Sequence, residues 1–310
     1  MQRWRGLDDV SGGSESCVVT IGMFDGVHRG HQVIIGRAVE VARGMGLPAV
    51  VLSFDPHPAA IVRSGSPPAV LTAPEPKAAL LAELGVDVMC VLPFTVAFSL
   101  LSPEEFVQHT LVERLHAAAV VVGANFRFGH RAAGTLETLQ ALGETGGFTA
   151  EGVPLVLTGD ETRVSSTYVR GQVAAGDVAA AALALGREHR IDGVVVRGDR
   201  RGRTIGYPTA NVEPQPHAAV PGDGVYAGRL LVAGSALPAA ISIGSNPTFD
   251  GIDRRVEAYV LDAPAELDLY DQSVGLSFAA RLRDTVRFDA VEELLAQMGR
   301  DVDRARAVLS

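Results

Sequence analysis

Lysine, cysteine and long apolar runs are scarce in this chain of 310 residues. Lys77 is its single lysine and is followed by Ala78, so the Gly-Lys-Ser/Thr loop of Walker-type nucleotide-binding proteins and the strand lysine of protein kinases are both excluded. Cys17 and Cys90 are too few for a disulfide framework or a thiolate metal cluster, and we expect two packed or partly buried free thiols. Any bound nucleotide must therefore be held by arginine, histidine, backbone N–H groups and metal.

Neither a membrane span nor a basic surface is expected. The sequence has no run of about 18 apolar residues, and its first residues lack the apolar core of a signal peptide. It has 27 Lys and Arg against 36 Asp and Glu, a formal net charge of −9. Because nucleic-acid binding relies on a basic face, we expect a cytoplasmic protein with no nucleic-acid or membrane partner. The sequence leaves the oligomeric state open.

The length suits two domains, and the pattern of apolar segments changes between residues 185 and 191. Before this point, strand-like apolar runs alternate with helical stretches, which predicts a doubly wound parallel sheet. After it, short apolar segments separated by Gly, Pro and Asp turns predict an antiparallel β-barrel, followed by a helix over 291–309. We therefore divide the chain into domains 1–185 and 186–310. The expected strands are 18–23, 49–54, 86–92, 118–123 and 153–157 in the first domain, and 191–196, 224–231, 239–243, 256–261 and 274–278 in the second.

The segment Phe-Asp-Gly-Val-His-Arg-Gly-His, residues 24–31, directly follows the first expected strand and precedes a helical stretch. A helix start offers unpaired N–H groups and the positive end of the helix dipole. His28 and His31, three residues apart, would project toward the same anion. Glycines let the backbone turn and approach closely. The pattern predicts a nucleotide-phosphate site formed by Gly22, Phe24, Asp25, His28, Gly30 and His31.

Other polar segments follow later strands, at the edge where the carboxyl ends of parallel strands meet. Asn125 and Arg127 lie in an alternation of aromatic residues and arginine, typical either of the lining for a planar ring or of a packed loop. Ser165 and Ser166 start a helix that also carries Arg170, whose fork of donors suits phosphate oxygens. Together they are candidates for a polyphosphate clamp, although hydroxyls at a helix start are usually only caps.

Two further segments carry structural predictions. Ser102, Pro103 and Glu105 predict a capped helix start. The segment 63–76, rich in Pro, Ser and Gly, is typical of a mobile flap or of an ordinary surface loop, and we favour the loop.

Taken together, the loops of the first half resemble nucleotidyltransferases whose HxGH loop binds ATP phosphates. The class I aminoacyl-tRNA synthetases share the two-histidine feature, but their Lys-Met-Ser-Lys-Ser loop is impossible with one lysine. The second half resembles riboflavin kinases, in which a glycine-rich segment precedes Pro-Thr-Ala-Asn. Over residues 16–309 the chain is thus similar to the bacterial bifunctional riboflavin kinase/FAD synthetase family. The residues of the kinase signature are Gly198, Gly202, Arg203, Gly206, Pro208, Thr209 and Asn211, with Glu257 downstream.

For the first domain, the resemblance implies that an FMN phosphate oxygen attacks the α-phosphorus of ATP and expels pyrophosphate. His28 and His31 would stabilise phosphate charge, and Asn125 would orient the reacting groups. The remaining first-domain candidates named above would bind the nucleotide, with the two serines and Arg170 on the β and γ phosphates.

For the second domain, the resemblance implies that the riboflavin 5′-hydroxyl attacks the γ-phosphorus of ATP. Glu257 would accept the proton, Thr209 and Asn211 would coordinate Mg²⁺, and the glycine-rich loop would cover the phosphates. The expected partners are thus riboflavin, FMN and ATP. Asp271 stands where glycine is frequent in the family, which bears only on a turn conformation.

Two rival interpretations remain at this point. The chain would be another HxGH nucleotidyltransferase, acting on a pantetheine, glycerol or nicotinamide phosphate, with the barrel as an accessory domain. Alternatively, it would be a flavin carrier or flavin-sensing regulator without turnover. The first interpretation leaves Thr209, Asn211 and Glu257 without a role. The second predicts that catalytic side chains have been replaced, and no such replacement is seen in the sequence.

Overall fold

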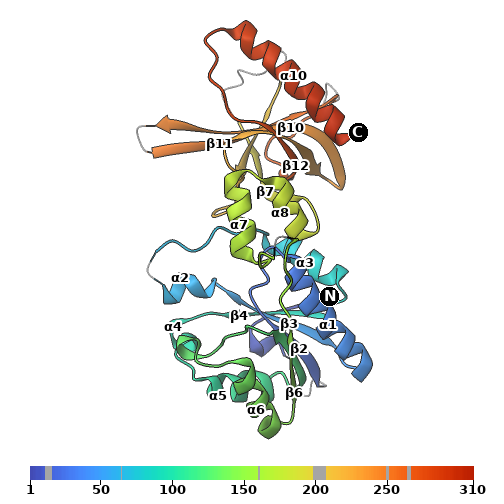
Figure 1. The fold of residues 1–310 in the computed structure, drawn as a ribbon, viewed down its shortest axis with the longest axis vertical. Helices are drawn as coiled ribbons and strands as arrows, with labels where there is room; N and C mark the ends of the chain where they lie inside the picture. The colour runs from blue at the N-terminus through green and yellow to red at the C-terminus, as the bar shows by residue number, and fades with distance from the viewer. Residues whose placement is uncertain (11–15, 64, 160, 198–206, 249–250, 264–266) are drawn as a thin grey trace. The chain divides into compact units, whose positions relative to one another are not determined.

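The chain folds into two compact units, one containing a parallel sheet and the other a barrel (Figure 1). A computed structural model describes residues 1–10, 16–63, 65–159, 161–197, 207–248, 251–263 and 267–310, with only the backbone described for 245–248 and 251–253. The first unit comprises residues 1–68 and 74–165, and the second comprises 69–73 and 166–310. By contacts, therefore, the helices α7 (Ser166–Ala175) and α8 (Val178–Leu185) group with the second unit. The division of the activities at residue 185 stays a prediction.

The first unit is built on a six-stranded sheet in the order β1-β4-β3-β2-β5-β6, in which every pair is parallel. Strands β2, β3 and β5 are almost continuous Val, Ala, Ile and Leu, and they are buried because helices cover both faces of the sheet. The predicted doubly wound fold is confirmed. The strands are β1 (Gln2–Arg5), β2 (Cys17–Ile21), β3 (Ala49–Asp55), β4 (Val88–Pro93), β5 (Ala117–Gly123) and β6 (Thr149–Val153).

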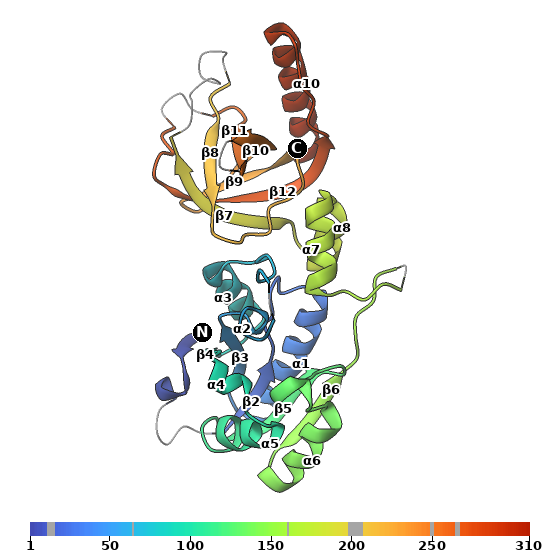
Figure 2. The same cartoon turned by 90° about the vertical axis from the view of Figure 1, so that its left-hand side faces the viewer.

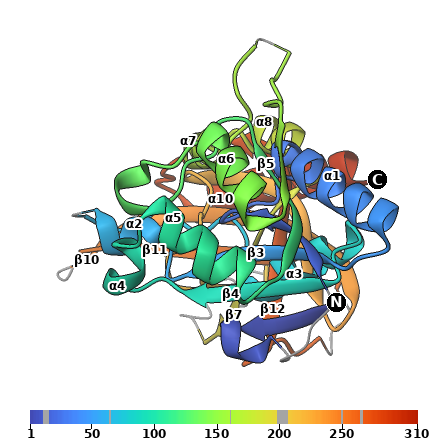
Figure 3. The ribbon, with the colours of Figure 1, turned by 90° about the horizontal axis from the view of Figure 1, so that it is seen from below.

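Helices α1 (Arg29–Met45) and α3 (Pro74–Glu83) pack on one face of this sheet, through side chains such as Ile35 and Leu81. The opposite face is covered by α5 (Pro103–Phe106), the π-helical segment η2 (Val107–Val112) and α6 (Leu136–Gly146). Figure 3 shows α5 and α6 side by side. The remaining short elements of this unit are η1 (Leu7–Asp9), α2 (Pro58–Val62), α4 (Val96–Ser99) and η3 (His130–Ala132).

Several local predictions can be compared with these elements. The predicted capping box is confirmed, because Ser102 Oγ accepts from Glu105 N at 3.1 Å and Glu105 Oε2 accepts from Ser102 N at 2.8 Å. The strand predicted at 153–157 is wrong: β6 ends at Val153, because Pro154 cannot donate to a ladder. Strand β1 was not predicted, since Gln-Arg-Trp-Arg at a sheet edge carries no apolar run. In the segment 63–76, residues 74–76 already belong to α3, and the described residues before them are in neither a helix nor a strand. The choice between a flap and a surface loop stays a prediction.

The second unit contains a closed barrel in the order β10-β11-β8-β7-β12-β9, with every pair antiparallel (Figure 2). In β7, buried and exposed residues alternate, as in a sheet with one face on the core. The predicted barrel is confirmed, but β8 was not predicted as a strand, because its sequence is short and polar. The strands are β7 (His189–Val196), β8 (Ala210–Pro214), β9 (Gly224–Val232), β10 (Ser235–Thr248), β11 (Gly251–Val260) and β12 (Ser273–Arg283).

The predicted C-terminal helix is α10 (Val291–Leu309), which packs against the outer face of the barrel through Ala305. Arg283 of β12 forms a bidentate ion pair with Asp301 of this helix, at 2.9 Å for Nε and 2.7 Å for Nη2 to Oδ2. Asp271 has φ +61°, the left-handed conformation expected of a turn in which glycine is frequent. Among the described residues, none of the helices combines the length and apolar character needed to cross a bilayer.

Candidate active sites

Residues 24–31 comprise the turn after β2 and the first residues of α1, at the carboxyl end of an interior strand of the sheet. His28 is the N-cap of α1, and its Nδ1 accepts a hydrogen bond from His31 N at 3.2 Å. In the neutral imidazole this leaves the proton on Nε2. The His28 and His31 rings stack with centroids 3.5 Å apart and an interplanar angle of 19°. The two imidazoles therefore lie together at the helix start, as the spacing predicts.

The backbone of this turn is strained. Phe24 and Val27 have φ of 48° and 40°, in the left-handed region that non-glycine residues rarely adopt. Both side chains are buried, at 2% and 1% exposure, which holds them in place. Gly22 is needed nearby, because a Cβ there would lie 3.0 Å from the Phe24 ring. Strain of this kind is typical of sites where the backbone must present a group in one orientation.

Two other loops meet the start of α1. A Cβ on Gly30 would lie 3.5 Å from the carbonyl oxygen of Val164, so the chain before Ser165 runs close to the helix. A Cβ on Gly123 would lie 3.3 Å from the Asn125 side chain and 3.3 Å from Ile34 of α1. The segment before Ser165 therefore lies beside the helix start at Gly30, and Asn125 lies beside Gly123, which faces Ile34 in the second turn of α1.

Sequence reasoning missed Arg163. With its amide oxygen turned toward the guanidinium, Asn125 accepts hydrogen bonds from Arg163 Nη1 and Nη2 at 2.9 and 2.8 Å. Arg163 is exposed and adds positive charge beside the predicted orienting residue. Its position two residues before Ser165 was the available signal, because a phosphate clamp is expected to contain arginine.

Phenylalanine side chains form a continuous cluster at the same edge of the sheet. Phe54, at the end of β3, contacts Phe94 and Phe98 at centroid distances of 5.6 and 5.7 Å. Phe126 stacks on Phe128 at 5.5 Å and 13°, while Arg127 between them is exposed. Phe128 is only 7% exposed and Phe126 packs against the same core, as the packed-loop interpretation expects. Contact of Arg127 with a planar ring stays a prediction.

The predicted clamp residues divide between the two units. Ser165 is the last residue of the first unit, whereas Ser166 and Arg170 lie in α7 of the second. Arg170 Nε donates to Ala69 O at 2.5 Å within that second unit. The joint action of these three residues on ATP stays a prediction.

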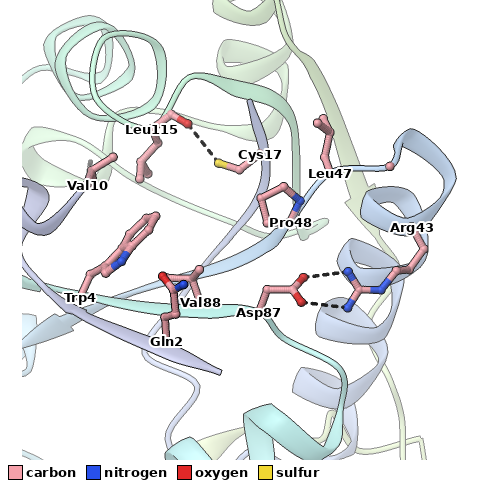
Figure 4. Close-up of a pocket in the computed structure, with 11 residues that line it drawn as sticks. Gln2, Trp4, Val10, Cys17, Arg43, Leu47, Pro48, Asp87, Val88 and Leu115 are labelled. Carbon is pink, nitrogen blue, oxygen red and sulfur yellow. Dashed lines mark hydrogen bonds and ion pairs between the residues drawn. The ribbon is translucent and has the colours of Figure 1, made fainter. Parts of the chain in front are cut away.

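A separate cavity of about 540 Å³ lies at the opposite edge of the sheet, where the strands begin (Figure 4). Trp4, Cys17 and Leu115 line it, and the Arg43–Asp87 ion pair at its side is closed at 2.8 Å. The pKa of the Asp87 carboxyl is held below its usual range by the Arg43 guanidinium. None of the predicted phosphate-binding residues lines this cavity. Ligands of doubly wound sheets bind at the other edge, beyond the carboxyl ends of the strands.

In the second unit, Thr209, Asn211 and Glu257 come together. Asn211 and Glu257 are directly paired across β8 and β11, and Thr209 Oγ1 donates to Glu257 Oε2 at 3.4 Å. Val212 and Val256 point into the core, so the neighbouring Asn211 and Glu257 face outward. Pro208 is exposed beside them, whereas the predicted binding residues Gly198, Gly202, Arg203 and Gly206 lie outside the described residues.

Aromatic packing holds this outer face in place. The Tyr207 ring lies 5.2 Å from that of Tyr259, two residues beyond Glu257 on the same side of β11. Tyr259 in turn packs in the cluster that contains Ala305 of α10. The C-terminal helix therefore supports the face that carries Glu257.

The donor set fits a magnesium ion. A hydroxyl, an amide oxygen and a carboxylate are hard oxygen ligands, and Mg²⁺ usually binds through one or two protein groups together with substrate phosphates and water. Among the described residues no group of three or more His, Cys, Asp or Glu suitable for a metal is found.

The fold and the two sites define a class: a phosphate-group transferase that joins an HxGH nucleotidyltransferase domain to a barrel with a Thr-Asn-Glu site. Two family models match the chain, FAD synthetase over residues 11–168 and riboflavin kinase over 185–309. The chain belongs to the bifunctional riboflavin kinase/FMN adenylyltransferase family of transferases.

Individual relatives match the chain over most or nearly all of its length. The bifunctional riboflavin kinase/FMN adenylyltransferase of Escherichia coli K12 is 38% identical over 308 residues, covering 99% of this chain and 97% of the relative. That of Bacillus subtilis 168 is 34% identical and covers 93% and 91%. A crystal structure described as a macrolide-efflux protein from Streptococcus pneumoniae has a TM-score of 0.90 and 32% identity, covering 98% of both chains.

Proposed function

We propose that this chain makes both flavin cofactors: the barrel unit phosphorylates riboflavin to FMN, and the sheet unit adenylylates FMN to FAD, with ATP as donor in both reactions. The observation that supports the proposal most is that the HxGH turn and the Thr209–Asn211–Glu257 group are both intact within one chain. An accessory barrel would give no role to the second group, and a flavin carrier or regulator without turnover would be expected to have eroded catalytic side chains. We assign the two activities to residues 1–185 and 186–310, in the cytoplasm, where ATP is available.

In the sheet unit, an FMN phosphate oxygen attacks the α-phosphorus of ATP while the bond to the leaving pyrophosphate breaks. No enzyme nucleophile is needed. His28 Nε2 and the N–H groups at the start of α1 stabilise charge on the phosphates, since donors fixed beforehand act most strongly on developing charge. Asn125, held by Arg163, orients the reacting phosphates.

In the barrel unit, the riboflavin 5′-hydroxyl attacks the γ-phosphorus of ATP, and ADP leaves. Glu257 accepts the hydroxyl proton, while Thr209 and Asn211 provide oxygens that would hold Mg²⁺. When bound, the ion would neutralise phosphate charge. Because phosphoryl transfer depends mainly on positioning and charge neutralisation, a carboxylate suffices as the base.

The direct test is to incubate the purified full chain with riboflavin, ATP and Mg²⁺ and to separate the flavins by chromatography. We expect FMN to appear first and FAD to follow, with pyrophosphate released only in the second step. FMN without FAD would refute the function of the sheet unit. FAD formed only from supplied FMN would refute that of the barrel.

A further inference from the structure

The single lysine of the chain lies in the interior of the sheet unit. Lys77 belongs to the first turns of α3 and is only 9% exposed. Its Nζ donates to the Met23 carbonyl oxygen at 2.5 Å and to Ser53 Oγ at 3.2 Å. The lysine thus connects three elements: helix α3, the end of β3 and the chain leaving β2.

The position of its main partner is informative. Met23 directly precedes Phe24, the first of the strained residues in the turn that leads to His28. Ser53 Oγ also donates to Met23 O, at 3.4 Å, so the same carbonyl is held by two side chains. Since a left-handed non-glycine residue persists only where its surroundings hold it, these bonds act on the peptide where the strain begins.

The charge of Lys77 is partly balanced by its surroundings. Asp25, in the strained turn, and Asp55, at the end of β3, are the carboxylates that act on it. Burial nevertheless lowers the pKa of Lys77 to about 8, so at neutral pH the amine is mostly protonated and has three donors. A charged group in the interior is costly to folding, and a neutral side chain of similar length would avoid that cost.

We infer that Lys77 is a positioning residue for adenylyl transfer, which holds the Met23 carbonyl against Ser53 and thereby presents His28 to the phosphates. It acts through the backbone of the turn and differs in this from a Walker lysine, which contacts phosphate. The inference rests on the proposed adenylyltransferase function of the sheet unit. It predicts that losing Lys77 impairs the chemical step more than substrate binding.

The test compares Lys77→Met, Lys77→Arg and the control Glu83→Gln in the full chain, where Glu83 is exposed on the same helix. We expect Lys77→Met to lower kcat for FAD formation from FMN by about 10²-fold, the usual cost of a misplaced reacting group, with a smaller change in KM for ATP. Lys77→Arg should restore part of the loss. Glu83→Gln and the riboflavin kinase activity of every variant should match the wild type.

Folding of the sheet unit is followed separately through Trp4, the single tryptophan of the chain, which lies in β1. If its fluorescence shows that Lys77→Met is unfolded at the assay temperature, the inference is tested with Ser53→Ala instead. This variant makes a smaller change in the same contact. A lower kcat in Ser53→Ala supports the inference, and an unchanged kcat overturns it.

Two other outcomes overturn the inference: a folded Lys77→Met variant with wild-type kcat, or a loss confined to KM that arginine does not restore. A wild-type chain that forms no FAD contradicts the proposed function instead. The two failures are therefore distinguishable.

Discussion

At the scale of the residue, burial limits the orientations open to the side chains of the proposed adenylyl-transfer site. His28 is 5% exposed, caps α1 and stacks on His31, so its ring is held in one orientation. A donor held in this way needs little reorganisation free energy when phosphate charge develops. The same ring on an exposed loop would contribute much less.

Replacing His28 with alanine is expected to lower the rate of FAD formation from FMN by about 10²–10³-fold, the usual cost of one preorganised donor. Phosphorylation of riboflavin by the same protein should be retained, because His28 lies in the sheet unit. Both rates are measured by chromatography of the flavins. Equal loss of the two activities would contradict this division of labour.

Glu257→Gln tests the base in the barrel unit, because the amide keeps the shape of the side chain but cannot accept the proton. FMN formation from riboflavin should fall by about 10²–10⁴-fold, the range for general bases. FAD formation from supplied FMN should continue at the wild-type rate. Retained kinase activity would refute the role of Glu257.

The two cysteines are expected to be inert in the folded chain. Both are buried and free, as predicted, and burial raises the pKa of each thiol to about 12. Since only the thiolate is nucleophilic, neither should react with a thiol-specific chromogenic reagent near pH 8. Addition of denaturant should expose both. Rapid labelling of native protein would contradict the buried placement of Cys17 and Cys90.

At the scale of the element, sequence patterns predicted strands well where burial on both faces makes a strand uniformly apolar. Strands β2, β3 and β5 are of this kind. The errors concern β1, β6 and β8. These strands are short or polar and are stabilised by pairing with β4, β5 and β11. An edge strand is stabilised mainly by pairing, which sequence periodicity does not record.

The attachment of α10 to the barrel depends on a buried ion pair. Asp301 and Arg283 side chains are 5% and 18% exposed, and Gln297 also donates to Asp301 Oδ1 at 2.8 Å. Asp301→Ala leaves the guanidinium without its partner and should destabilise the barrel unit by about 3–5 kcal/mol. Denaturant unfolding monitored by circular dichroism measures the loss. The control is Asp303→Ala, whose exposed pair with Arg306 should contribute little.

A stability of Asp301→Ala equal to that of the Asp303 control would show that α10 is held by its apolar contacts alone. Because α10 packs beside Tyr259, the kinase activity of Asp301→Ala should also be lost at a lower temperature than that of the control. FAD formation from FMN provides the comparison within the same sample.

At the scale of the whole molecule, each of the two units has its own core, with the HxGH turn in one and the Thr209–Asn211–Glu257 group in the other. In the sheet unit, loops after different strands converge at one edge, as the parallel topology requires. In the barrel, antiparallel pairing sets Asn211 directly opposite Glu257. The candidate residues were predictable from motifs, but their partners Arg163 and Lys77 were not, because these contacts join segments far apart in sequence.

Metal dependence is a prediction for the complete enzyme. Chelation of Mg²⁺ with EDTA should abolish FMN formation from riboflavin. The barrel offers the ion only a few oxygen ligands, so we expect weak binding that EDTA can outcompete. Added Mg²⁺ should restore the rate, whereas added Ca²⁺, which prefers more and longer-bonded oxygen ligands, should restore less. Undiminished kinase activity in excess EDTA would contradict the assignment of Thr209 and Asn211 as metal ligands.

Two units and the fold class of each were predictable from the sequence, because both follow from local periodicity, and the candidate motifs were recognisable because their side chains lie a few residues apart. The side chains that contact these motifs were found only in the folded chain. The Asn125–Arg163 contact and the bond from Lys77 to the strained Met23–Phe24 turn arise when helices and loops pack on a sheet. From the sequence, we could say of Lys77 only that it does not belong to a Walker loop. In the structure it contacts the turn that leads to His28, because α3 packs against that turn.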